Sequence, residues 1–124
     1  MTDCDIEEFD QSYTSIPFYD MMLRKGKNTG RYKDNQFKIE CIAPEEYFKE
    51  VSRFHQTTSE MEKGATWSSR VDEYKKKTME GSPMPIPLLD YNSRVAEGRH
   101  RAMAAIQLGI KKMPVLVITK YKKY

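Results

Sequence analysis

Apolar and polar side chains alternate over residues 37–42, and the spacing changes to a helical one after Pro44. Alternation with a period of two is typical of a strand with one buried face. Proline followed by Glu45 and Glu46 favours a helix start, because proline is tolerated there and carboxylates suit the first turn. The apolar stripe of this predicted helix consists of Tyr47, Phe48, Val51 and Phe54.

A second helix is predicted to begin at Ser68 or Ser69, which are candidate N-cap residues, and to end near Gly81. The proline-rich run 83–87 cannot form a central strand, because proline has no amide donor. It leads into an apolar segment at 88–91, which we expect to pair as a hairpin with residues 94–96.

A third helix is predicted just after Gly98, with small and apolar residues on one face. Residues 113–118 are almost continuously apolar, which is typical of a buried central strand. The pattern therefore predicts an α/β (α+β) fold with a small mixed sheet and about three helices. Residues 1–36 show no such periodicity, so we expect an irregular N-terminal arm followed by one domain over residues 37–124.

The composition narrows the class of protein. A chain of 124 residues with 31% charged residues fits one small domain. No stretch approaches the roughly 18 apolar residues of a membrane helix, so no membrane contact is expected. The two cysteines have no metal-ligand spacing and there are only two histidines, so no metal site is assigned. Because no secretory signal is visible, we expect free thiols in a reducing, cytoplasmic compartment.

The net charge of +3 is small, but the charges are unevenly distributed. The first ten residues are acidic, whereas the segment 24–38 is rich in lysine and arginine. Such a segment usually forms solvated surface, and the alternative is a surface for DNA or for an acidic protein partner.

The run Gly98-Arg99-His100-Arg101-Ala102 places basic side chains directly after a glycine at a predicted helix start. Helix N-termini carry partial positive charge and normally attract acidic side chains. Basic residues at this position therefore predict a compensating anion, such as a phosphate group.

This segment resembles the superfamily that unites ParB-like N-terminal domains with sulfiredoxins. The ParB pattern G-E-R-R-x-R-A-A, followed by three residues, G-[LI], two residues and I-P, lies over Gly98 to Pro114 without a gap. The sulfiredoxin motif G-C-H-R also aligns, through His100 and Arg101. The direct matches to the ParB pattern are Gly98, Arg101, Ala104, Ala105, Gly109, Ile110 and Pro114.

The resemblance implies a nucleotide whose phosphates bind at this turn: CTP as in ParB proteins or ATP as in sulfiredoxins, with or without Mg²⁺. Arg101 is then the expected phosphate clamp, because a planar guanidinium suits phosphate geometry. His100, Arg99 and the amides after Gly98 are further expected contacts. Ser69 is either another phosphate contact or a helix cap.

Two departures separate the chain from the best-known chemistry of these families. Arg99 stands where sulfiredoxins have their catalytic cysteine, so sulfinic acid reduction is not expected. Met103 replaces the last arginine of the ParB pattern, which removes one cation from a triphosphate site.

Whether the chain is an enzyme stays open on the sequence. The nucleotide serves either as a switch or as a phosphoryl donor, for which Glu97 and Glu40 are the candidate catalytic carboxylates. Glu97 has the alternative of an ion pair with Arg94 or Arg99. Other functions to consider are a DNA-binding protein or metal-dependent nuclease, a small-molecule kinase, and a catalytically inert phage or plasmid interaction protein. The acidic candidates for a nuclease are Glu40, Glu45, Glu46, Asp90 and Glu97.

Overall fold

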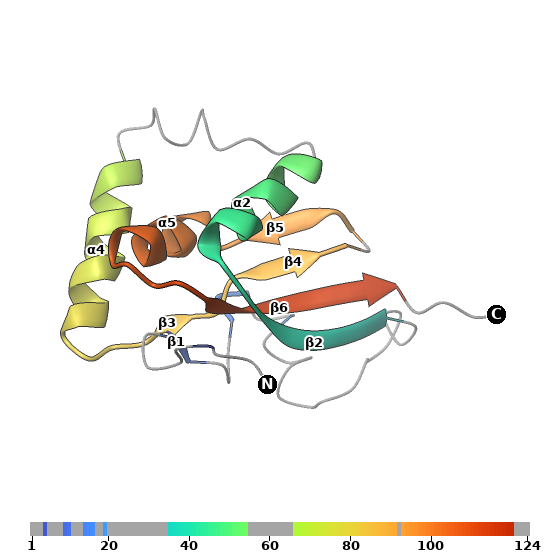
Figure 1. The fold of residues 1–124 in the computed structure, drawn as a ribbon, viewed down its shortest axis with the longest axis horizontal. Coiled ribbons are helices and arrows are strands. Elements are labelled where there is room, and N and C mark those ends of the chain that lie inside the picture. The colour runs from blue at the N-terminus through green and yellow to red at the C-terminus, as the bar shows by residue number, and fades with distance from the viewer. Residues whose placement is uncertain are drawn as a thin grey trace.

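The computed structural model describes Cys4, residues 9–10, 14–16 and 19, and then residues 35–54, 66–91 and 93–120. The backbone alone is described for residues 35–37 and 120. The elements, shown in Figure 1, are β1 (Phe9–Asp10), β2 (Asn35–Ile42), α2 (Pro44–Arg53), α4 (Trp67–Met79), β3 (Met84–Pro85), β4 (Leu88–Asp90), β5 (Val95–Glu97), α5 (Arg99–Gln107) and β6 (Met113–Lys120).

The main sheet has four strands in the order β2-β6-β4-β5. Strand β6 pairs antiparallel with β2 and parallel with β4, and β4 pairs antiparallel with β5. The mixed sheet and the three helices of the described residues confirm the predicted α/β class. The apolar segment after Pro114 is indeed central, and its side chains over 113–118 are buried.

The hairpin predicted after the proline-rich run is present as β4 and β5. Leu88 lies opposite Glu97, and Asp90 lies opposite Val95. The Asp90 carboxylate accepts a hydrogen bond from the Ser93 amide at 3.0 Å, which stabilises the turn between the strands. The hairpin therefore delivers the chain from the sheet centre to its edge, directly before α5.

Of the described helices, α2 and α5 lie above the main sheet in the view of Figure 1 and α4 runs down its left side, and α5 contacts both α2 and α4. The predicted apolar stripe of α2 is confirmed, because Tyr47, Val51 and Phe54 are buried. On α5 the buried face includes three alanines, whose small side chains permit a close approach between helices. The site residues at the start of α5 are thus held between two helices and the edge of the sheet.

The predicted serine cap of α4 is wrong. The helix begins at Trp67, and Thr66 in the N-cap position makes no side-chain cap. Ser69 lies in the first turn instead, where its hydroxyl donates to the Thr66 carbonyl at 3.2 Å. A serine two positions inside the helix bonds backwards to a carbonyl and leaves the free amides of the helix start uncapped.

The predicted end of α4 at Gly81 is confirmed. Gly81 has a φ of +94°, which a glycine adopts without penalty. The Ser82 amide donates to the Lys77 carbonyl at 2.9 Å, and the Gly81 amide donates to the Thr78 carbonyl at 3.0 Å. This pair of bonds is the Schellman arrangement, and it turns the chain sharply toward β3.

The described parts of the N-terminal arm are attached to the domain at three places. Strand β1 pairs in parallel with β3 as a second, two-stranded sheet, which the sequence pattern did not predict. The Tyr19 hydroxyl donates to the buried Asp90 carboxylate on β4. A disulfide joins Cys4 to Cys41 on β2, so the expectation of two free thiols is wrong.

The disulfide links cysteines 37 positions apart, with their Cα atoms 5.4 Å from each other. Such a separation is within the normal range for a disulfide, but no sequence spacing encodes it. Among the helices that the structure describes, none is long and apolar enough to cross a membrane.

Candidate functional site

Gly98 forms the junction between β5 and α5. It is the N-cap of α5 and has a left-handed φ of +109°. A Cβ atom at this position would lie 2.6 Å from the Pro87 Cβ and 2.8 Å from the Pro87 Cα. Both the backbone conformation and the close approach to Pro87 therefore require glycine. The predicted glycine turn is confirmed, and it joins the edge strand β5 to the start of α5.

Arg101 lies inside the molecule, with only 3% of its side chain exposed. Its Nη2 lies 2.5 Å from the Glu97 Oε1 and 3.5 Å from the Ile86 carbonyl oxygen. The guanidinium carbon also lies 5.7 Å from the centroid of the Tyr74 ring. The predicted phosphate clamp is thus a buried ion pair, formed by a carboxylate and a guanidinium four residues apart.

The charge on Arg101 is kept by this pairing. Burial lowers the pKa of Arg101, but the Glu97 carboxylate and the Tyr74 hydroxyl raise it, and the net shift is upward. Its Nε is buried without a hydrogen-bond partner among the described residues. Arg101 therefore carries a permanent positive charge in the first turn of α5.

Tyr47 is a site residue that the sequence pattern assigned only to the core. Its hydroxyl donates to the carbonyl oxygen of Glu97 at 2.6 Å, and its ring is fully buried. Burial and the nearby Glu97 carboxylate both raise the pKa of Tyr47, so it stays a neutral donor. This bond fixes the residue before Gly98 to helix α2. A buried tyrosine on an apolar helix face was the available signal, since its hydroxyl needs a partner.

The charges of several neighbouring residues act on His100. The half-buried imidazole lies against the Trp67 ring, with the ring centroids 4.8 Å apart. Burial lowers the pKa of His100, and the positive charges of Arg70, Arg101 and Arg99 lower it further. Three guanidinium groups from two helices therefore act on one imidazole.

The first turn of α5 contains no acidic residue, and its N-cap glycine has no side chain with which to cap the helix. The nearby carboxylate, Glu97, is already paired with the buried Arg101. The helix dipole and the charges of Arg70, Arg99 and Arg101 all act at this helix start. An anion bound there would relieve mutual repulsion between these groups.

The other predicted site residues lie apart from this turn or have structural partners. Glu40 is on β2 and forms an ion pair with Lys38 at 2.8 Å. Glu97 is on β5, at the opposite edge of the sheet. With two strands between them, the two carboxylates are on the order of 14 Å apart, which is too far for a shared reacting group. Ser69 is exposed on the first turn of α4, and nothing joins its hydroxyl to α5.

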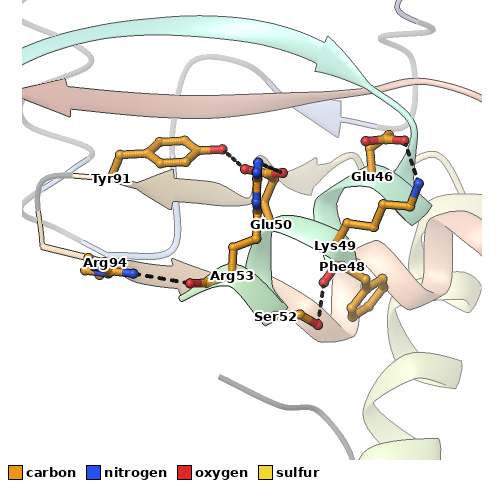
Figure 2. Close-up of polar contacts among 8 residues, drawn as sticks. All are labelled: Glu46, Phe48, Lys49, Glu50, Ser52, Arg53, Tyr91 and Arg94. Carbon is orange, nitrogen blue, oxygen red and sulfur yellow. Dashed lines mark hydrogen bonds and ion pairs between the residues drawn. The ribbon is translucent and has the colours of Figure 1, made fainter. Parts of the chain in front are cut away.

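The acidic candidates for a nuclease do not converge either. Glu46 pairs with Lys49 at 3.3 Å on α2, as Figure 2 shows, and Asp90 is buried beneath the Tyr19 hydroxyl. Among the described residues, no group of three or more metal-ligating side chains is close enough to hold an ion. Most of the basic segment 24–38 lies outside the described residues.

A polar network at the end of α2, drawn in Figure 2, supports the hairpin that leads to the site. The Tyr91 hydroxyl donates to the Glu50 Oε1 at 2.6 Å, and the Glu50 Oε2 lies 3.3 Å from the Arg53 Nη1. The Arg94 guanidinium donates to the Arg53 carbonyl at 3.3 Å. Burial and the hydrogen bond to Glu50 raise the pKa of Tyr91. These contacts join residues about 40 positions apart, so sequence periodicity does not indicate them.

Comparisons of the chain with known protein families, with curated proteins and with solved structures find no match. The resemblance to ParB-like domains and sulfiredoxins therefore stays a prediction carried by the Gly98–Pro114 pattern.

Proposed function

We propose that the chain binds a phosphate-bearing ligand, a nucleotide such as ATP or CTP, at the N-terminus of α5. The observation that carries the proposal is the start of α5, which has a glycine N-cap, no side-chain cap and no acidic residue in its first turn, and where the charges of Arg70, Arg99 and Arg101 act on His100. Backbone amides at such a start bind phosphate oxygens, and the helix dipole favours their charge. The choice of ATP or CTP comes from the sequence resemblance.

The proposal gives the predicted contacts two roles. Arg101 acts as a positioning residue, because its guanidinium is buried and paired with Glu97. The groups that would touch phosphate are the half-buried Arg99 and His100, the exposed Arg70 of α4, and the amides that follow Gly98. Arg70 directly follows Ser69 in the region that the resemblance to sulfiredoxins gives as a source of further phosphate contacts, and α4 lies directly beside α5 in Figure 1.

The proposal concerns binding, with the nucleotide as a switch or as a phosphoryl donor. A general base must be free and within hydrogen-bond reach of its proton. Glu97 is paired with Arg101, and Glu40 lies at the other edge of the sheet. Neither carboxylate fills the predicted catalytic role in this arrangement.

Isothermal titration with ATP, CTP and inorganic triphosphate, each with and without Mg²⁺, tests the proposal. Arg70→Gln and Arg99→Gln should each weaken binding by about tenfold, since each removes one charge-assisted contact. Arg53→Gln is the matched control, because Arg53 is an exposed arginine of α2 in the separate network of Figure 2. Equal affinities for all four proteins would refute the site. Absence of binding by any of the three phosphates would favour the inert interaction protein instead.

The pH dependence gives an independent test through His100. Its pKa in the free protein lies below the usual 6.5, because of burial and the three arginines. A bound phosphate adds negative charge nearby and must raise that pKa, so binding takes up a proton. Affinity should therefore rise as the pH falls from about 7.5 toward the free-state pKa. His100→Gln should abolish the upward shift seen by NMR titration and leave only the ligand's own protonation; an unshifted imidazole in the complex would contradict the assignment.

A further inference from the structure

A cavity of about 450 Å³ is lined by residues of helix α4, of the turn that follows it and of strand β3. Its volume falls within the range of small-molecule sites, which is roughly 300–1,000 Å³. Among the described residues, its lining consists of Tyr74, Lys77, Ser82, Pro83, Met84 and Pro85.

The walls of this cavity are fixed by contacts from several directions. Met84 is buried and lies opposite Phe9 in the β1–β3 pair. The Tyr74 ring lies against the Arg101 guanidinium, at 5.7 Å from the ring centroid. Ser82 is held by the hydrogen bond of its amide to the Lys77 carbonyl. Met84 and Tyr74 are held in place by these contacts, so the apolar part of the wall is preformed, which lowers the entropic cost of binding.

The lining has a simple chemical division. A tyrosine ring, two proline rings and a methionine provide the apolar surface, whereas Lys77 and Ser82 provide the polar groups. Lys77 is the charged group of the described lining, and it is positive. We propose that this cavity binds a small aromatic carboxylate. The aromatic ring of the ligand packs against Tyr74 and the prolines, and its carboxylate pairs with Lys77.

Lys77 already has a neighbour of opposite charge. The Lys77 Nζ lies 3.5 Å from the Glu73 Oε2, one helical turn away on α4. The side chains of Lys77 and Glu73 are 58% and 61% exposed, so water screens this pair and it contributes little to stability. A ligand carboxylate seated beside the apolar wall replaces Glu73 as the partner of Lys77 at small cost.

Phenylacetate and its neutral isostere phenylacetamide are the probes for this site. Each is titrated to about 20 mM into the ¹⁵N-labelled full chain, because ligands of this size bind with dissociation constants on the order of 1 mM. Phenylacetate should shift the amide signals of the cavity residues and bind threefold to fivefold more tightly than phenylacetamide, about the contribution of one exposed ion pair.

Two substitutions on α4 and one matched control separate the charge contribution from the rest. Lys77→Gln should abolish the preference for the carboxylate, and Glu73→Gln should strengthen phenylacetate binding by freeing Lys77. Lys76→Gln is the control, since Lys76 is an equally exposed neighbour that does not line the cavity. It removes the same charge and should leave the preference intact.

The proposal is overturned if neither probe shifts the cavity residues, if both bind equally, or if the preference survives Lys77→Gln. Shifts confined to the start of α5 would likewise overturn it, because they would assign the carboxylate to the positively charged turn. The experiment contains no phosphate ligand, so its outcome is independent of the proposed nucleotide site.

Discussion

Glu97→Gln breaks the buried ion pair with Arg101 while preserving the shape of the side chain. The Arg101 side chain is 3% exposed, and among the described residues it would keep the Ile86 carbonyl at 3.5 Å, Tyr74 and the uncharged amide oxygen of the new side chain as partners. Removing one member of a buried pair costs about 3–5 kcal/mol, because the other charge is left uncompensated. Glu97 is 26% exposed, so water already screens part of the pair, and we expect a loss of about 2–3 kcal/mol in the free energy of unfolding.

Urea denaturation followed by circular dichroism measures this loss. With a slope of about 2 kcal/mol per molar urea, the midpoint should fall by roughly 1–1.5 M. The ion pair between Glu73 and Lys77 is the control for burial, because it has the same spacing of four residues but is mostly exposed. Glu73→Gln should change stability by less than about 1 kcal/mol.

A double variant separates two contributions to the free energy of unfolding. One is the penalty for leaving a single buried charge without a partner, and the other is the net contribution of the ion pair. Replacing Glu97 with Leu and Arg101 with Met removes both charges and retains most of the volume. Buried ion pairs replaced in this way are often neutral in stability, so the double variant should recover most of the loss. A Glu97→Gln variant that lost less than about 1 kcal/mol, or that matched Glu73→Gln, would refute the assignment of Arg101 as a buried, paired charge.

Three further changes test other parts of the fold. Gly98→Ala should cost about 2–4 kcal/mol in urea denaturation, from the positive φ and the overlap with a proline, whereas Gly109→Ala, also at positive φ but in open space, should cost only about 1 kcal/mol. Reduction of the Cys4–Cys41 disulfide should cost about 4 kcal/mol, the closure entropy of a loop of this length, and an unchanged midpoint would contradict it. Leu116→Ala in the buried central strand should cost about 3–5 kcal/mol by the same assay, and a cost near 1 kcal/mol would contradict its central position.

The sequence predicted the elements whose signal is local. The alternation at 37–42, the proline at the start of α2 and the glycine at the end of α4 each depend on a few neighbouring residues. The apolar run after Pro114 indicated a central strand because a strand buried on both faces leaves no polar positions. All four features appear in the structure at nearly the expected places.

The features that escaped prediction depend on contacts between distant residues. Strands β1 and β3 have two residues each, too few to show a period. The disulfide and the Tyr91–Glu50 bond join positions that no local pattern relates. They become evident only once the strand order is known.

The sequence motif located the candidate site, but it did not predict the role of Arg101. The pattern around Gly98 indicates residue types and a turn, and it does not say whether Arg101 points outward or inward. Glu97 ends strand β5 and Arg101 lies in the first turn of α5, so neither a helix period nor a strand period indicates their ion pair. The packing of α4 against α5 brings Arg70 of α4 into electrostatic contact with His100.

The central position of β6 has a consequence for synthesis on the ribosome. Both β2 and β4 need β6 as a partner, yet β6 is the last of the described strands to be made. About 70 residues separate Ile42, at the end of β2, from Met113, at the start of β6. At roughly 5–20 residues per second, β2 waits on the order of 4–14 s without its neighbour. Throughout that interval the edge of β2 that will pair with β6 is unpaired. Until β6 is made, chaperones can protect this edge from pairing with other chains.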